Sequence, residues 1–220
     1  MSIPILVVLL VLRLTPHSLD HETPLERTAR ALTYGRAIDA AVTRATCDHY
    51  GEPVPDCRPL WHRPRLELAL WLLALAYSET RLARHVHAGK CRPWECGGRP
   101  ALWVSSWQIA ESPLVPRRLH RQLAGLDLEH TTRAATTAAR IFARAWHHCR
   151  ENPLGAIALY ATGNLCEWEG SHERWRLYDT LQTWADDLRQ EHRKPLQGDP
   201  NAENPIRPGT LESAGHSFRG

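Results

Sequence analysis

The residue best placed to do chemistry is Glu79, near the end of an apolar run, LELALWLLALAYSETRL, from Leu66 to Leu82. Apolar residues recur through this run at helical spacing, and Glu79 falls on the same stripe. Burial of a carboxylate disfavours its charged form. A carboxyl group beside Trp71, Leu72 and Leu75 would therefore hold a proton that it can donate, and we predict that Glu79 is a catalytic acid.

The elements that must position this group are mostly helical. Thr23-Pro24-Leu25-Glu26 has the form of a capping box, Asp127 and Asn152 are candidate caps, and Gly163 is a helix stop. With prolines and apolar spacing, these signals predict six helices, at about 23–49, 64–87, 116–123, 127–149, 152–160 and 171–193. The inner face of the first would contain Leu25, Ala29, Leu32, Ile38, Val42 and Ala45. Residues 101–110 suit a short strand or an extended edge. The sequence thus predicts a mainly α single domain with little or no strand.

The N-terminal residues 1–22 are set apart by the apolar run IPILVVLLVL. Roughly ten apolar residues match the core of a secretory signal and are too few to span a bilayer comfortably. No Lys or Arg precedes the run and no small-x-small cleavage site follows it, so a cleaved signal and a retained membrane anchor are both open. We expect a leader at 1–22, a domain at 23–193, and a disordered tail at 194–220, where Pro and Gly occur without periodicity.

The chain has six cysteines, and an even number behind an export-like leader favours disulfides with clipped loops. Proximity in the sequence favours Cys47 with Cys57, Cys91 with Cys96, and Cys149 with Cys166, while other pairings stay open. A metal site is not expected, because the histidines near Cys91 and Cys96 lack a second matched pair of ligands. No cofactor is expected either. We predict a protein exported to the periplasm or cell envelope, or a phage protein that acts there.

Composition narrows the class of partner. The formal net charge is +3, with Arg spread through the 220 residues, which is poor evidence for nucleic-acid binding. Nine Trp against two Phe is unusual. Indole rings offer flat apolar faces that suit sugar rings, and the tryptophans we expect to do so are Trp103 and Trp107, with Trp94 and Trp168 as further candidates.

Three short motifs stand in a fixed order: Tyr77-Ser78-Glu79-Thr80, Ser105-Ser106-Trp107-Gln108-Ile109, and Ala158-Leu159-Tyr160-Ala161-Thr162-Gly163-Asn164. Together they resemble the lysozyme-like lytic transglycosylase superfamily, which includes soluble lytic transglycosylases and relatives from conjugation systems and phages. In that family a Glu-Ser dipeptide ends a buried helix, a Gly-Leu-Met-Gln-Ile-like segment follows, and an Ala-x-x-Tyr-Asn-x-Gly segment closes the groove. The resemblance covers residues 66–188.

The resemblance implies an enzyme that breaks the MurNAc-GlcNAc β-1,4 bond of peptidoglycan. One Glu protonates the leaving sugar and then takes the proton of the muramyl C6 hydroxyl, which gives a 1,6-anhydro product. Carried over residue by residue, Glu79 is the acid and base. The implied substrate-binding residues are Thr80, Trp103, Ser106, Trp107, Gln108 and Tyr160. Glycan strands are the implied partner, with association to a membrane through the leader and to a secretion, conjugation or virion assembly as further expectations.

The departures from the family pattern leave alternatives open. Thr80, Ser105 and Ala161 stand where Ser, Gly and Asn are usual. A hydrolytic muramidase would need a second carboxylate, for which Glu95 is better placed than Glu111 or Asp127 in the sequence. A non-catalytic wall-binding component of an assembly is the alternative from another class. For Glu79 itself, the alternative to a catalytic role is an exposed helix end paired with Arg81 or Arg84.

Overall fold

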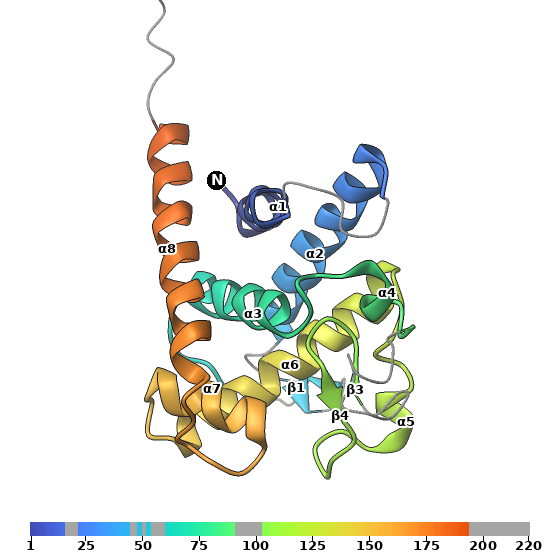
Figure 1. Cartoon of the computed structure of the whole chain (residues 1–220), viewed down its shortest axis with the longest axis vertical. Helices are drawn as coiled ribbons and strands as arrows, with labels where there is room; N and C mark the ends of the chain where they lie inside the picture. The colour runs from blue at the N-terminus through green and yellow to red at the C-terminus, as the bar shows by residue number, and fades with distance from the viewer. Residues whose placement is uncertain (16–21, 45–47, 50–51, 54–59, 91–102, 194–220) are drawn as a thin grey trace, which may run out of the picture.

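The structure is a computed structural model that describes residues 1–15, 22–44, 48–49, 52–53, 60–90 and 103–193. Eight α-helices form most of this described part of the chain (Figure 1), which confirms the mainly α prediction. They are α1 Ile3–Leu14, α2 Pro24–Arg44, α3 Arg65–Thr80, α4 Arg84–His87, α5 Arg117–His120, α6 Leu128–His148, α7 Pro153–Thr162 and α8 Ser171–Arg193. Two antiparallel pairs of two-residue strands complete it: β1 Asp48–His49 with β2 Glu52–Pro53, and β3 Trp103–Val104 with β4 Ile109–Ala110.

Helix α3 lies at the centre, and α1, α2, α6 and α8 pack against it (Figure 1). Every residue from Leu68 to Ala76 is buried, as the apolar run predicted. The helix is shorter than the predicted 64–87, because Arg81 and Leu82 both adopt left-handed backbone conformations with φ of 53° and 58°. Two such residues in succession cannot continue a right-handed helix, so the chain turns there and resumes as the short α4.

Helix α1 contains the apolar run of the N-terminal residues. Leu6, Val7 and Leu10 are buried in the same core as α3, and α1 packs against α2, α3 and α8. Gly35 of α2 permits this close approach, since a Cβ at that position would lie 2.6 Å from the Pro4 carbonyl oxygen. Within the described ranges, no helix combines the length and the apolar character that crossing a membrane requires.

Helix α2 begins with the predicted capping box. The Glu26 amide donates to Thr23 Oγ1 at 3.2 Å, and the Thr23 amide donates to Glu26 Oε2 at 2.9 Å. The predicted inner face is wrong near this end: Leu25 and Leu32 are 78% and 45% exposed, and Ala29 is exposed too. Ile38 and Val42 are buried as predicted, together with Ala31, Tyr34, Ala37 and Ala41, because α1, α3 and α6 cover that face. Ala45 lies outside the described residues.

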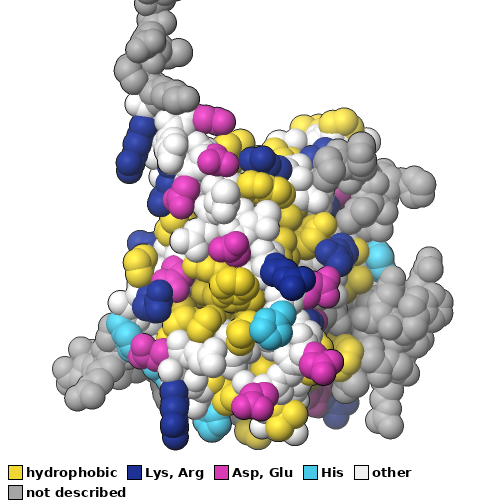
Figure 2. All heavy atoms as spheres, turned by 60° about the vertical axis from the view of Figure 1, so that its left-hand side comes forward, with side chains coloured by type: hydrophobic (Ala, Val, Ile, Leu, Met, Phe, Trp, Pro, Cys, Tyr) yellow, Lys and Arg dark blue, Asp and Glu magenta, His cyan; other side chains and the backbone are white. Residues whose placement is uncertain are grey.

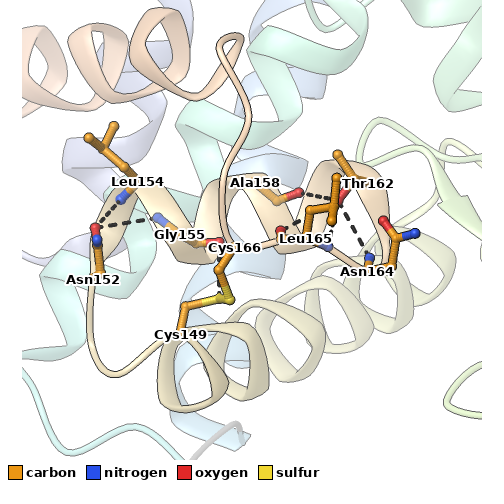
Figure 3. Close-up of a disulfide and its surroundings, with 9 residues drawn as sticks. All are labelled: Cys149, Asn152, Leu154, Gly155, Ala158, Thr162, Asn164, Leu165 and Cys166. Atoms are coloured by element: carbon orange, nitrogen blue, oxygen red, sulfur yellow. Dashed lines mark hydrogen bonds between the residues drawn. A yellow bond between two sulfur atoms is a disulfide. The ribbon is translucent and has the colours of Figure 1, made fainter.

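Helices α6 and α7 form a hairpin that is capped at both starts, as predicted. Asp127 accepts from the His130 amide at 3.0 Å, and Asn152 accepts from the Leu154 amide at 3.0 Å. Gly163 ends α7 with φ of 79°. The Cys149–Cys166 disulfide, predicted from the sequence, ties the end of α6 to the loop after α7 (Figure 3). The other predicted pairs, Cys47–Cys57 and Cys91–Cys96, lie outside the described residues, as does the tail at 194–220.

The face of the molecule that includes α8 carries both signs of charge. Figure 2 shows basic, acidic and histidine side chains there, interspersed with exposed hydrophobic ones. The hydrophobic side chains on α8 include Trp175, which is 38% exposed.

Candidate functional site

A groove of about 710 Å³ is lined by the end of α3, the β3–β4 hairpin, α6 and α7. It brings together Glu79, Gln108 and Tyr160, one from each of the three sequence motifs. Trp103, at the start of β3, also lines the groove and is 38% exposed. Residues separated by up to about eighty positions in the chain therefore share one surface.

Glu79 lies on the last turn of α3 and pairs with Arg174 of α8. Arg174 donates to Glu79 Oε1 through Nη2 at 2.8 Å and through Nε at 3.1 Å. The side chains of Glu79 and Arg174 are 17% and 15% exposed. The sequence predicted an apolar setting for this carboxylate, whereas the structure gives it a guanidinium partner. That partner is also not Arg81 or Arg84, whose carboxylate partners are Glu173 and Glu26.

Two contacts hold the Arg174 guanidinium in place beside Glu79. Its guanidinium lies over the Trp168 ring, 4.6 Å from the ring centroid, and its Nη1 donates to the Gly170 carbonyl at 3.5 Å. A side chain at Gly170 would meet the Trp168 ring at 2.3 Å. Sequence reasoning missed Arg174, because it is 95 positions from Glu79 and belongs to no motif; only the packing of α8 against α3 brings it there.

Tyr160, on α7, donates its hydroxyl to the Trp107 carbonyl at 2.8 Å. Burial and then the negative charge of Glu79 raise the pKa of the Tyr160 hydroxyl well above its usual range. The phenol therefore stays protonated throughout the neutral range. It joins α7 to the β3–β4 turn and presents a neutral polar group to the groove.

Gln108 sits in the β3–β4 turn with a left-handed backbone, φ of 46°. A residue other than glycine in this region carries a conformational cost that is often found at functional sites. Its Nε2 donates to the Ser105 carbonyl at 3.2 Å, while its buried Oε1 has no partner in the described part of the chain. An unpaired buried amide oxygen is costly unless a ligand supplies the donor.

Three residues of the motifs support the groove without lining it: Thr80, Ser106 and Trp107. Ser106 and Trp107 are both 0% exposed. Ser106 Oγ bonds the Tyr34 hydroxyl of α2, and the Trp107 indole donates to the Leu72 carbonyl at 2.9 Å. Thr80 Oγ1 donates to the Ala76 carbonyl at 3.0 Å. The predicted substrate contacts of Ser106 and Trp107 are therefore not available in this structure, because neither has an exposed surface.

A buried ion pair on α2 supports the turn after Glu79. Arg30 bonds both oxygens of Glu22 at 2.6 Å, and its Nη1 donates to the Leu82 carbonyl at 2.5 Å. Next to it, burial and the Arg30 charge lower the pKa of His87 to about 3. Burial raises the pKa of Tyr34 to about 12. His87 and Tyr34 are thus neutral, and this network holds the two turns that carry Glu79 and Gln108.

The groove contains one carboxylate, Glu79, among the described residues that line it. Glu111 lies elsewhere, 3.8 Å from Arg117, and Asp127 caps α6. Glu95 and Trp94 fall outside the described residues. Trp168 is 40% exposed and contacts Arg174.

The groove also contains residues that no sequence motif indicated. Arg144 and His148 of α6 add basic groups. Their helical positions were predictable, but which face of α6 meets the groove depends on how α7 folds back against it. No set of three metal-ligating side chains gathers in the groove within the described ranges.

The chain matches no protein-family model, no curated protein and no solved structure with which it was compared.

Proposed function

We propose that this protein cleaves peptidoglycan as a lytic transglycosylase of lysozyme-like fold, with Glu79 as acid and then base. The observation that supports this most strongly is the groove itself. The three motif residues Glu79, Gln108 and Tyr160, taken from separate parts of the chain, line one surface. The proposal concerns a protein exported to the cell envelope, as the resemblance of its motifs implies.

In the proposed reaction, protonated Glu79 gives its proton to the glycosidic oxygen as the bond from C1 of MurNAc breaks. The Glu79 carboxylate then takes the proton of the C6 hydroxyl of the same sugar, and O6 bonds to C1. The products are a GlcNAc end with a free hydroxyl and a 1,6-anhydro-MurNAc end. Tyr160, held neutral, and Gln108 contribute polar groups beside the reacting sugar.

The other groove residues fit a muropeptide. The exposed face of Trp103 suits a sugar ring. Arg144 and His148 supply basic groups for the carboxylates of the peptide substituent. Gln108 lines the same groove, where its side-chain amide suits a sugar hydroxyl or an N-acetyl group.

One carboxylate favours transglycosylation over hydrolysis. Hydrolysis of a glycoside uses two carboxyl groups, set apart by about 5 to 9 Å depending on stereochemistry. The described lining of the groove offers Glu79 alone. The hydrolytic alternative therefore depends on Glu95, outside the described residues.

The Glu79–Arg174 ion pair favours a second candidate, a wall-binding protein without catalysis. Two hydrogen bonds from Arg174 occupy Glu79 Oε1, whereas the first step needs this carboxyl group to face the glycosidic oxygen. Catalysis therefore requires the bound glycan to separate Glu79 from Arg174. The groove reaches this carboxylate, and among the described residues Arg174 bonds Oε1 alone.

The test is digestion of purified sacculi by the parent protein and by Glu79→Gln, with the soluble products analysed by mass spectrometry. We expect anhydro ends from the parent and a loss of at least about 100-fold in Glu79→Gln. Glu173→Gln is the matched control, because the Glu173 side chain is 81% exposed on α8. Reducing ends would identify a hydrolase, and binding of sacculi without any soluble product would leave the wall-binding candidate.

A further inference from the structure

A second cluster of chemistry-bearing side chains lies outside the groove. It consists of His62, in the segment before α3, His147, on the last turn of α6, and Glu151, in the turn between α6 and α7. Glu151 Oε1 is 3.7 Å from His62 Nε2 and 4.0 Å from His147 Nδ1. One potential ligand atom from each residue lies within 4.8 Å of the other two. Within the described part of the chain, no other group of three His, Cys, Asp or Glu side chains has its ligand atoms this close together.

The hydrogen bond of His147 decides which ring nitrogen faces the cluster. His147 Nε2 lies 2.8 Å from the Leu60 carbonyl oxygen. A carbonyl can only accept, so Nε2 carries the hydrogen, and in the neutral ring Nδ1 keeps its lone pair. Nδ1 is the atom that faces Glu151. A histidine that donates one N–H to a backbone carbonyl and offers the other nitrogen is the usual arrangement of a metal ligand.

The carboxylate is held by a constrained turn. Arg150 and Glu151 both have left-handed backbones, with φ of 57° and 61°. The Glu151 amide donates to the Trp146 carbonyl at 2.8 Å, and the Cys149–Cys166 disulfide and the Asn152 cap flank the turn (Figure 3). Glu151 therefore projects from a fixed backbone and not from a free loop.

We propose that His62 Nε2, His147 Nδ1 and the Glu151 carboxylate form a surface site for a divalent transition-metal ion of the Zn²⁺ class. Two imidazoles and one carboxylate are ligands that zinc accepts, with bonds of about 2.0 to 2.2 Å. In tetrahedral geometry such bonds place ligand atoms about 3.4 Å apart. The two measured separations are within about 1 Å of this value, a movement that these exposed side chains can make.

The surroundings are compatible with a cation. The side chains of His62 and Glu151 are each 55% exposed and that of His147 is 36% exposed, so an ion can enter from solution and water can complete its coordination. Arg63, next to His62 in the chain, has its Nε bonded to Glu67 at 2.7 Å and its guanidinium over Trp146. Arg63 is thus directed to other partners.

The site would join two parts of the fold that are distant in sequence. His62 precedes the central helix, while His147 and Glu151 belong to the α6–α7 turn. An ion bound to the native arrangement and not to the unfolded chain stabilises the fold by mass action. The metal therefore acts as a clamp on the N-terminal end of α3, separate from the chemistry of the groove.

The experiment is calorimetric titration of chelator-treated full-length protein with ZnSO₄, for the parent and for His62→Ala, His147→Ala and Glu151→Gln. We expect the parent to bind, each of these three variants to lose about tenfold or more in affinity, and Zn²⁺ to raise the unfolding midpoint of the parent but not of these three variants. His192→Ala and Glu191→Gln, which change exposed residues at the end of α8, are matched controls that should bind like the parent. Far-UV circular dichroism checks that each variant is folded.

Cobalt substitution identifies the ligands independently. Co²⁺ in the proposed site should show visible d–d absorption without the thiolate charge-transfer band that cysteine ligands produce. No Zn²⁺ binding by the parent would overturn the proposal. So would unchanged affinity in His62→Ala and His147→Ala, or a cobalt spectrum with the thiolate band.

Discussion

Two arginine–glutamate pairs in this molecule differ in how buried they are and in how many carboxylate oxygens the arginine binds. In the Arg30–Glu22 pair, each oxygen of Glu22 has its own donor at 2.6 Å, and the side chains are 7% and 1% exposed. In the Arg174–Glu79 pair, both donors go to Oε1, at 2.8 Å and 3.1 Å, and the side chains are 15% and 17% exposed. The first pair is closed, while the second leaves half of the carboxylate for a ligand.

The difference shows how similar ion pairs can serve structure and function. The buried charges of Glu22 and Arg30 are compensated on every side, including through the Leu82 carbonyl, and a buried pair of this kind is costly to break. The Glu79 pair faces a groove and can exchange partners at lower cost. We expect substitutions in the first pair to change the free energy of unfolding, and substitutions in the second to change activity.

The largest expected effect is that of Glu22→Gln. It leaves the Arg30 guanidinium buried without its counter-charge, and we expect the free energy of unfolding to fall by about 3 to 5 kcal/mol. Urea denaturation followed by circular dichroism measures the loss.

The matched control for this prediction is Glu129→Gln. Glu129 forms an exposed pair with Arg133 one turn along α6, and such pairs contribute about 0.5 kcal/mol. If the two substitutions destabilised the protein equally, burial would not distinguish the pairs and the comparison would fail.

The second prediction concerns His87, which the Arg30 charge helps to keep neutral. The pKa of His87 is about 3 in the folded chain, lowered from an ordinary value of 6.5 by burial and by Arg30. Below pH 6.5 the unfolded chain binds a proton that the folded chain does not. Folding stability is therefore fully present above that pH and falls by about 1.4 kcal/mol per pH unit as the pH drops towards 3.

Urea denaturation at pH 7 and pH 5 tests this for the parent and for His87→Gln. The variant should lose less stability than the parent between the two pH values, whatever its stability at pH 7. His172→Gln, at an exposed position of α8, should follow the parent. Equal pH dependence in the parent and His87→Gln would show that His87 is not a buried neutral group.

Local signals predicted much of the fold. The capping box at Thr23, the caps at Asp127 and Asn152 and the Gly163 stop all depend on short-range hydrogen bonds or backbone conformations, and the structure contains them. The break after Thr80 was not predictable, because it depends on Arg30 binding the Leu82 carbonyl from a helix 52 positions away. The exposure of Leu25 has the same origin, since α1 and not periodicity decides which face of α2 is covered.

The residues of the candidate site also fall into those that local motifs indicate and those that only tertiary packing reveals. The motifs indicated Glu79, Gln108 and Tyr160, which the structure brings together in the groove. They did not reveal that Trp107 and Ser106 point into the core, because a tryptophan in a motif can pack or bind with the same sequence around it. Arg174 was missed because only the tertiary packing of α8 against α3 brings it to Glu79.

The third prediction tests the open pair directly. Arg174→Gln removes the guanidinium whose two hydrogen bonds occupy Glu79 Oε1 and which the bound glycan must displace, so we expect turnover on sacculi to rise several-fold. The loss in the free energy of unfolding should be smaller than that of Glu22→Gln, because the Arg174–Glu79 pair is less buried. Turnover and urea denaturation are measured on the same preparations. Arg176→Gln, at an exposed position on the same helix, is the control. A fall in turnover would instead make Arg174 a substrate-binding residue.

The smallest expected effect is that of Gly170→Ala, which acts on Arg174 through Trp168. The new Cβ would lie 2.3 Å from the Trp168 ring, so the ring must move from its place beneath the guanidinium. Because an exposed side chain can shift cheaply, we expect less than about 1 kcal/mol of destabilisation, comparable to the loss of one cation–π contact. Turnover should change in the same direction as in Arg174→Gln but by less. If Gly170→Ala left turnover unchanged while Trp168→Ala altered it, the ring would act on the glycan and not through Arg174. The open pair would then be held by α8 alone.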